Sequence, residues 1–256
     1  MIVMSTPPPT TSCGRQYPAA ADDGDEFHFC STCAFSQACL SEGYEKQDLA
    51  ALHILVDHVG PIEPGQYIFR EGERFNTIAA IRGGTVKTFV MDTYGNEQVL
   101  GFHLPGEVIG LNAIHSARFP CSAVALDTVA LCCFSFPRIS LLATRMPGLQ
   151  QHLFRLLSLD IGKASMLAGD HSAEARMAAF FMLLSQRYAA RGFSTTRFTL
   201  TMTRADIASH LRLAAETVSR IIKRFNADRL IEIRHRDVQL LDIERLVALA
   251  KPILRD

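Results

Sequence analysis

Short β-type runs separated by glycine-containing turns fill residues 62–136, and this pattern constrains the fold more than any other part of the chain. Runs such as 85–90 and 98–102 are rich in Val, Phe, Leu and Thr, and turn dipeptides such as Gly83-Gly84 lie between them. Glycine supplies the positive φ angles that many tight turns need. Short strands at regular spacing are typical of an antiparallel barrel or roll. We therefore predict a β-roll within residues 27–145 of an α+β chain.

A long helix is predicted to follow this roll, at residues 146–170, because glycines become rare and apolar residues recur at helical spacing. Leu149, Leu153 and Leu156 share one face, which we expect to pack on the roll. A neighbouring face follows intervals of three and four, as in the seam of a coiled coil. Its residues are Phe154, Leu157, Ile161, Ala164 and Ala168. Two interpretations stay open for this face: it docks on its own domain, or it pairs with a second copy of the chain.

The C-terminal part, residues 171–256, is predicted to form a winged helix-turn-helix. Thr203 can cap its first short helix, with Asp206 three residues later at the capping-box position. The second helix is followed by two β-type runs around a polar turn, as in a two-stranded wing. The predicted elements are a helix at 204–211, a turn at 212–214, a helix from 215 to about 228, and a hairpin of 230–233 with 238–241.

The second helix of this pair is predicted to read DNA bases. In a helix-turn-helix the second helix enters the major groove, and its exposed face would carry Glu216, Ser219 and Arg220. Arginine pairs with guanine, glutamate accepts from cytosine, and serine contacts thymine or phosphate. The alternative is an ordinary solvated helix face. Phosphate contacts are predicted for Thr203, Lys223 and Arg224.

The distribution of charge favours a polyanionic partner for the C-terminal part alone. The whole chain has a net charge of zero, but residues 197–236 carry nine bases and four acids. Residues 1–60 have the opposite balance, with eight acids and two bases. Within them, residues 1–26 are rich in Pro, Thr, Ala and Asp and are predicted to be disordered. Residues 45–59 are predicted to form a short amphipathic helix.

Cys30, Cys33 and Cys39 lie within ten residues of one another, in a chain with seven cysteines. We expect a reducing compartment, in which such spacing indicates metal or redox chemistry more than a disulfide framework. Thiolates this close together can share one metal centre. From the spacing, three alternatives stay open: an iron–sulfur cluster, a structural zinc ion, or thiol redox sensing without a metal.

These segments resemble the CRP/FNR regulators over roughly residues 28–245. The resemblance rests on Pro-Gly-Glu-Val-Ile-Gly at 105–110, the glycine-punctuated roll, the long helix, and Glu-Thr-Val-Ser-Arg at 216–220. The oxygen-responsive FNR branch is most similar, since Ala215 stands where the CRP type carries arginine. The resemblance implies a cyclic-nucleotide-binding-like jelly roll and a homodimer that binds a TTGAT-N4-ATCAA-like palindrome. Anaerobic activity is expected, with RNA polymerase as a further partner of an activator, while the choice between activation and repression stays open. Arg212 departs from the family, because glycine is common at that turn.

The resemblance further implies a [4Fe-4S] cluster, held by three N-terminal cysteines of this spacing and a fourth cysteine from the roll. The matching residues are Cys30, Cys33, Cys39 and Cys132. Cys133 is adjacent, but side chains alternate along a strand, so only one of the pair should face the cluster. Haem bound by His28, His103 or His115 is a weaker alternative for a gas sensor.

Several functions are not expected. Cyclic-nucleotide binders follow Gly-Glu with an Arg-Ser pair that holds the phosphate, but Pro120-Cys121 occupies that place here. Glu107 is then interpreted as a turn residue. The sequence contains no Ser/His/Asp set, no paired catalytic carboxylates and no phosphate-binding glycine loop, so we do not expect an enzyme. Without a membrane-length apolar run or a signal peptide, a cytoplasmic location is expected.

Overall fold

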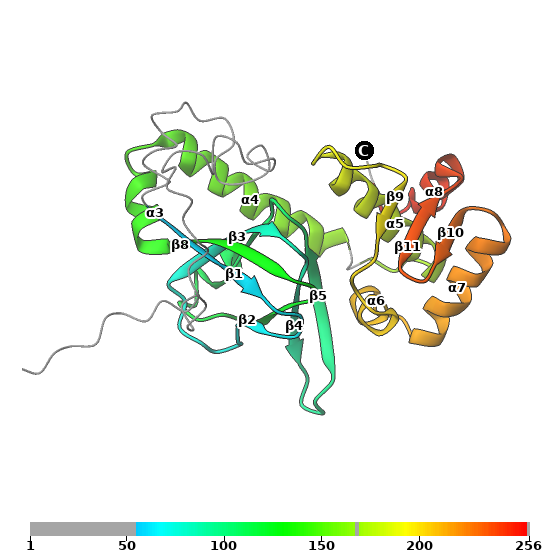
Figure 1. The fold of residues 1–256 in the computed structure, drawn as a ribbon, viewed down its shortest axis with the longest axis horizontal. Coiled ribbons are helices and arrows are strands. Elements are labelled where there is room, and N and C mark those ends of the chain that lie inside the picture. The colour runs from blue at the N-terminus through cyan, green and yellow to red at the C-terminus, as the bar shows by residue number, and fades with distance from the viewer. Residues whose placement is uncertain (1–54, 167–168, 255–256) are drawn as a thin grey trace, which may run out of the picture.

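A computed structural model of the chain describes residues 55–166 and 169–254. Figure 1 shows a β-roll beside helices α3 and α4. A smaller C-terminal domain lies on the side of the roll that carries strand β5. This arrangement confirms the predicted α+β class, with an N-terminal roll, a long helix and a C-terminal winged helix-turn-helix. None of the described helices is long and apolar enough to cross a membrane.

The roll consists of two antiparallel four-stranded sheets. The first has the order β1-β8-β3-β6 and the second the order β2-β7-β4-β5. Their inner faces are apolar and enclose one core. The strands are β1 (Val56–Ile62), β2 (Tyr67–Phe69), β3 (Thr77–Gly83), β4 (Val86–Met91), β5 (Glu97–His103), β6 (Val108–Ile109), β7 (Ser122–Ala125) and β8 (Val129–Ser135). A 3₁₀ turn, η1 (Leu111–Ala113), follows β6.

The glycines predicted to mark turns do so, and Gly84 shows why no other residue fits there. It has a φ of +79°, and a Cβ at this position would lie 2.4 Å from the carbonyl oxygen of Thr128. A side chain would therefore meet both an unfavourable backbone conformation and a steric clash. The turn between β3 and β4 depends on this glycine.

The prediction of a helix at 45–59 is wrong for residues 55–59, which the structure describes. Val56–Ile62 is strand β1, which pairs with β8 so that Val59 lies opposite Leu131. A helix-like spacing of apolar residues is ambiguous over so few positions. Cross-strand pairing and burial against the roll decide the conformation. Residues 45–54 lie outside the described part of the chain.

Helix α3 (Phe136–Ala143) leads into α4 (Pro147–Met166), which packs on the roll as predicted. Leu149 is fully buried there, and Leu153 and Leu156 pack partly buried against the same core. The predicted seam face is different: Phe154 and Ile161 are 61% and 69% exposed. The seam residue between them, Leu157, is half-buried at the edge of the roll core. The side chain of Ala164 and the whole of Ala168 lie outside the described residues.

The C-terminal domain follows α4 and has its own apolar core. Phe181 of α5, Ile207 of α6 and Phe225 of α7 are almost completely buried in it. The predicted two-stranded wing gains a third strand, because β9 pairs with β11 in the order β10-β11-β9. The elements are α5 (Ala173–Ala189), β9 (Arg197–Thr199), α6 (Arg204–Leu211), α7 (Ala215–Ala227), β10 (Ile231–Arg234), β11 (Asp237–Leu240) and α8 (Ile243–Ala250).

The roll and the C-terminal domain share an apolar contact. Val99 and Phe102 of β5 belong to the same buried cluster as Phe180 of α5. The ring of His210 packs against both aromatic rings, with its centroid 5.1 Å from that of Phe102 and 6.3 Å from that of Phe180. Burial in this contact lowers the pKa of His210 to about 4, so the ring is neutral at neutral pH.

The turn after α6 provides a test of backbone strain. Arg212 has φ 54° and ψ 47°, the left-handed conformation in which glycine is favoured by roughly 1 kcal/mol. Arg212→Gly should therefore raise the free energy of unfolding by about 0.5–1 kcal/mol in chemical denaturation. The matched control is Arg220→Gly in the exposed interior of α7, which should lower it by about 1 kcal/mol. Destabilisation by both changes would contradict the prediction.

The lowered pKa of His210 predicts that the free energy of unfolding decreases in acid. Its folded pKa is below its unfolded value of about 6.5, so protons bind the unfolded chain first as the pH falls. The neutral ring therefore contributes fully above pH 6.5, and this contribution is lost as the pH falls toward 4. His210→Gln should flatten the pH dependence of unfolding in that range, by up to about 3 kcal/mol. His115→Gln, at an exposed histidine of the roll, is the control. Equal slopes for the two variants would refute the assignment.

Candidate nucleic-acid interface and cysteine site

The cap of α6 forms as the sequence predicts. The Thr203 hydroxyl accepts a hydrogen bond from the backbone N–H of Asp206 at 3.1 Å. The Asp206 carboxylate in turn accepts from the Thr203 N–H at 2.9 Å and from its hydroxyl at 2.6 Å. Both donors of Thr203 are thus committed to the cap. A phosphate, which only accepts hydrogen bonds, would have to displace Asp206 to bind the Thr203 hydroxyl.

Helix α7 is strongly amphipathic, as a reading helix must be. Val218, Ile221, Ile222 and Phe225 form its buried face against the rest of the domain. Figure 1 shows α7 on the side of the C-terminal domain that faces away from the roll. The helix is therefore anchored on one side and open on the other. On the open side, Glu216, Arg220 and Lys223 are exposed and Ser219 is half-buried.

The predicted reading residues differ in their present partners. The guanidinium of Arg220 only contacts the hydroxyl of Thr217 on its own helix, at 3.3 Å. Ser219 donates its hydroxyl to the carbonyl of Ala215 at 3.0 Å. Arg224 forms an ion pair with Glu174 of α5, and its Nε lies 3.7 Å from the carboxylate of Asp228. A phosphate contact by Arg224 would have to replace these acids, whereas Arg220 can turn toward a base edge directly.

The cysteine site is only partly described. Cys30, Cys33 and Cys39 lie outside the described residues, as does His28. Cys132 of β8 is half-buried, and its sulfur lies 3.5 Å from Nδ1 of His58 on the paired strand β1. The same nitrogen lies 3.5 Å from the guanidinium of Arg82. Within the described part of the chain, no group of three His, Cys, Asp or Glu residues could hold a metal ion. A metal at Cys132 would need ligands from elsewhere in the chain.

The two adjacent cysteines of β8 face opposite sides of the sheet, as alternation predicts. Cys133 is 2% exposed in the core of the roll and is disulfide-bonded. Cys121 is also buried, which raises the pKa of its thiol and makes it a poor thiolate. Of these cysteines, Cys132 is the one on the outer face, beside two basic side chains.

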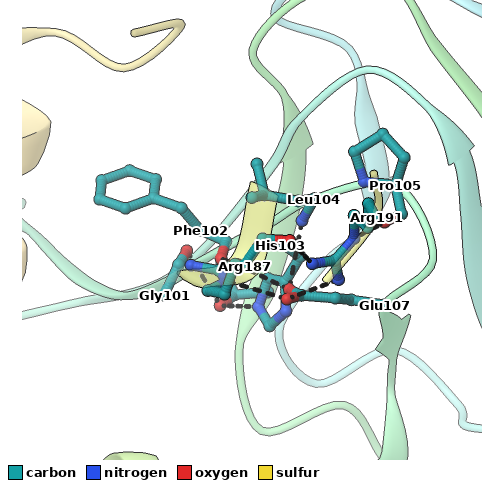
Figure 2. Close-up of polar contacts among 9 residues, drawn as sticks. Gly101, Phe102, His103, Leu104, Pro105, Glu107, Arg187 and Arg191 are labelled. Atoms are coloured by element: carbon teal, nitrogen blue, oxygen red, sulfur yellow. Dashed lines mark hydrogen bonds and ion pairs between the residues drawn. The ribbon is translucent and has the colours of Figure 1, made fainter. Parts of the chain in front are cut away.

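Glu107 has a role that the sequence analysis missed. It does complete the predicted turn, since Oε2 accepts from the N–H of Leu104 at 3.2 Å. The same carboxylate also binds Arg187, in the last turn of α5, and Arg191, just beyond the end of that helix, both in the other domain (Figure 2). The two arginines are only four residues apart in the sequence, on either side of the end of α5. That pattern was the available signal, but the partner acid could not be found without the fold.

A β-roll, a long helix with an exposed apolar seam, and a winged helix-turn-helix with an exposed second helix define a DNA-binding transcription regulator. Residues 60–143 match the family described as cyclic nucleotide-binding domain, and residues 175–249 match the Crp-like helix-turn-helix domain. The chain is 38% identical to the transcriptional activator protein Anr of Pseudomonas protegens over 224 residues, which cover 86% of this chain and 92% of that protein.

The fumarate and nitrate reduction regulatory protein of Salmonella typhi is also 38% identical, with 86% of this chain and 90% of that protein covered. The chain therefore belongs to the CRP/FNR family of transcription regulators. These relatives are regulators and not enzymes, as the sequence predicted. FixK2 from Bradyrhizobium japonicum has the same fold, with a TM-score of 0.69 and 23% identity over 76% of this chain and 96% of that one.

The exposed guanidinium of Arg220 predicts base-specific reading. Arg220→Ala should weaken binding to a matched site by about 1–3 kcal/mol and relax discrimination at one base pair. Lys223→Ala, one turn along the same exposed face, should weaken binding to all sequences alike and reduce its salt dependence. Fluorescence anisotropy on a matched duplex and its single-base variants measures both effects. An equal loss on matched and random DNA for Arg220→Ala would reassign this arginine to phosphate.

Proposed function

We propose that this protein is an FNR-type regulator that binds a TTGAT-N4-ATCAA-like palindrome as a homodimer and responds to oxygen through a [4Fe-4S] cluster. The observation that carries the proposal is the open face of α7, where Glu216 and Arg220 stand exposed on an anchored helix. The relatives named for anaerobic regulation support the oxygen response, among them the anaerobic regulatory protein of Haemophilus influenzae at 38% identity.

Base reading follows from the chemistry of this face. Arg220 offers two parallel N–H donors for the O6 and N7 acceptors of guanine, and Glu216 accepts from the amino group of cytosine. Ser219 can release Ala215 to contact thymine or phosphate. Lys223, with Arg224 and Thr203 once they exchange their present partners, would contact phosphate. Ala215 at the start of α7 provides no third base-reading side chain, which favours the FNR-type half-site over the CRP type.

Dimerisation would use the exposed seam of α4. Phe154 and Ile161 are large apolar side chains left in solvent, and Leu157 lies between them at the edge of the roll core. A second copy would cover them. A two-fold axis along this seam would place two α7 helices about 34–36 Å apart, one turn of DNA. Asp160 is adjacent to Ile161, and its repulsion across the axis would keep dimerisation marginal and open to regulation.

Cys132 would hold the cluster together with Cys30, Cys33 and Cys39. Its position fits this role, because it lies on the outer face of β8 beside His58, and the guanidinium of Arg82, which contacts the same ring nitrogen, would offset the negative charge of thiolate ligands. When bound, such a cluster supplies iron that oxygen can oxidise. Cys132 itself would tie the N-terminal segment to the sheet, so that losing the cluster removes a link between that segment and the dimer.

A thiol redox switch is the second candidate, because Cys133 takes part in a disulfide. In that case the cysteines would respond to oxidation without a metal. A structural zinc ion on the same cysteines would give a regulator whose DNA affinity is independent of oxygen. The two cluster-free alternatives share the DNA interface with the main proposal and differ from it at the cysteines alone. Activation would further require contact with RNA polymerase.

Metal analysis separates these alternatives. Protein purified without oxygen should be brown, hold about four irons and four sulfides per chain, and lose its absorbance in air. Cys132→Ala should lose most of the iron and the palindrome affinity while its helices keep their circular dichroism. Cys121→Ala removes a buried thiol from the same roll and should keep both.

A colourless protein that contains one zinc ion would overturn the cluster. So would a Cys132→Ala variant that retains the iron. Two results together would establish the thiol switch. Metal-free wild-type protein would have two thiols that exposure to air protects from alkylation, and its affinity for the palindrome would be lost when those thiols are oxidised.

A further inference from the structure

A buried ion cluster joins the β-roll to the DNA-reading domain; we call Glu107, Arg187 and Arg191 the Glu107 clamp (Figure 2). Arg187 donates from Nε to Oε1 of Glu107 at 2.8 Å and from Nη2 to Oε2 at 2.6 Å. Arg191 donates from Nη2 to Oε1 at 3.0 Å. The side chains of Glu107 and Arg191 are only 12% and 4% exposed. Arg187 is more accessible, at 23%, so the charges of Glu107 and Arg191 are the ones that depend most on their partners.

Both arginines are held further by backbone carbonyls of the roll. Arg187 also donates to the carbonyl of Phe102 at 2.5 Å, and Nε of Arg191 donates to the carbonyl of Pro105. The fork of a guanidinium is planar, so two simultaneous bonds fix its direction as well as its distance. The clamp therefore fixes α5 in both position and direction relative to the loop between β5 and β6.

A second set of contacts ties the same strands to α6. Lys87 of β4 bridges Glu97 at 2.5 Å and Asp206, the capping-box partner of Thr203 in α6, at 2.8 Å. Burial disfavours the charge on Lys87, but hydrogen bonds to Asp206 and Glu97 outweigh burial and raise its pKa. The hydroxyl of Ser209 donates to the carbonyl of Glu97 at 2.7 Å and accepts from the N–H of Val99 at 2.9 Å. The reading domain is held by two of its helices.

These contacts leave the reading surface open. They involve α5 and α6, whereas Glu216, Arg220 and Lys223 project from the exposed face of α7. The contact therefore orients the reader without covering the residues that would read bases.

The covalent connection between the two domains is short. Between α4 and α5 the chain has only residues 167–172. Arg176 holds the end of this connection by donating to the carbonyls of Gly169 and His171, and it also donates to the carbonyl of Leu211.

We propose that Glu107, with Arg187 and Arg191, is a positioning contact that sets the angle between the roll and the reader and thereby the half-site spacing the dimer accepts. The inference rests on the proposed function, since only a dimer on a palindrome has a spacing to select. If the seam of α4 fixes the two rolls, the clamp fixes each reader on its roll, and the separation of the two α7 helices follows. A loosened clamp lets each reader turn independently.

The test is the spacing preference of the full-length Glu107→Gln variant, prepared without oxygen. A neutral amide places an NH2 donor where one carboxylate oxygen accepted from Arg187 or Leu104, and it carries no charge to balance the two buried guanidinium groups. Affinity is measured on TTGAT and ATCAA half-sites separated by 3, 4, 5 or 6 base pairs, and on a single half-site. We expect wild type to favour one spacing about tenfold, and Glu107→Gln to lose most of that preference. Its single half-site affinity should stay within about twofold of wild type.

Two further variants complete the design. Glu63→Gln removes the same charge from an exposed turn of the roll and should behave as wild type. Ser209→Ala removes two hydrogen bonds of the second set and leaves no buried charge without its partner. It should weaken the spacing preference in the same direction as Glu107→Gln, by a smaller factor. It remains informative if Glu107→Gln does not fold. Hydrogen exchange should show lost amide protection in residues 99–104 and 204–211 of Glu107→Gln.

Three results would overturn the positioning role. One is an equal loss of affinity at every spacing, which would mean that the clamp only stabilises the fold. Another is tighter binding by Glu107→Gln, which would mean that the clamp restrains the reader. The third is an unchanged spacing preference in Glu107→Gln and Ser209→Ala. A wild-type protein that binds none of the duplexes would instead overturn the proposed DNA site, and the positioning role with it.

Discussion

The relation between the two halves of this protein depends on the buried carboxylate of Glu107. Its oxygens accept from two guanidinium groups at the C-terminal end of α5, and the apolar contact of Phe102 with Phe180 and His210 lies next to them. Without the carboxylate, Arg187 and Arg191 would be left as poorly paired cations at a largely dry contact, which is one of the costlier arrangements in a protein. The roll therefore holds the reading domain in one defined orientation.

Ion pairs of this kind contribute little net stability, because the cost of removing charges from water offsets most of their attraction. Their effect is on geometry. Apolar side chains such as Val99 and Phe102 tolerate some sliding, since the hydrophobic effect has no direction. A guanidinium group bound to a carboxylate does not tolerate sliding, because both hydrogen bonds must keep their angles. A regulator that must present a reading helix at a defined angle gains from the second kind of contact.

The clamp also lies close to the cysteine site through the strands of the roll. Ile81 of β3 donates its N–H to the carbonyl of Glu107 at 2.9 Å and accepts from the N–H of Gly106 at 2.7 Å. The residue before it, Ala80, pairs with Cys132 across β3 and β8. A change at Cys132 is thus two backbone contacts away from the loop that carries Glu107. The outer face of one sheet and the reading domain are joined by rigid, hydrogen-bonded backbone.

The sequence by itself determined the elements whose cause is local: the glycine turns, the capping box of Thr203 and Asp206, the strain at Arg212, and the amphipathic faces of α4 and α7. These depend on backbone sterics and on residues a few positions apart, which a sequence displays directly. The tertiary structure alone decided that residues 56–62 form a strand, that Cys133 lies inside the roll and Cys132 outside it, and that Glu107 faces Arg187 and Arg191. Those outcomes join residues far apart in the sequence, up to the 84 positions between Glu107 and Arg191, where long-range pairing and burial outweigh local pattern.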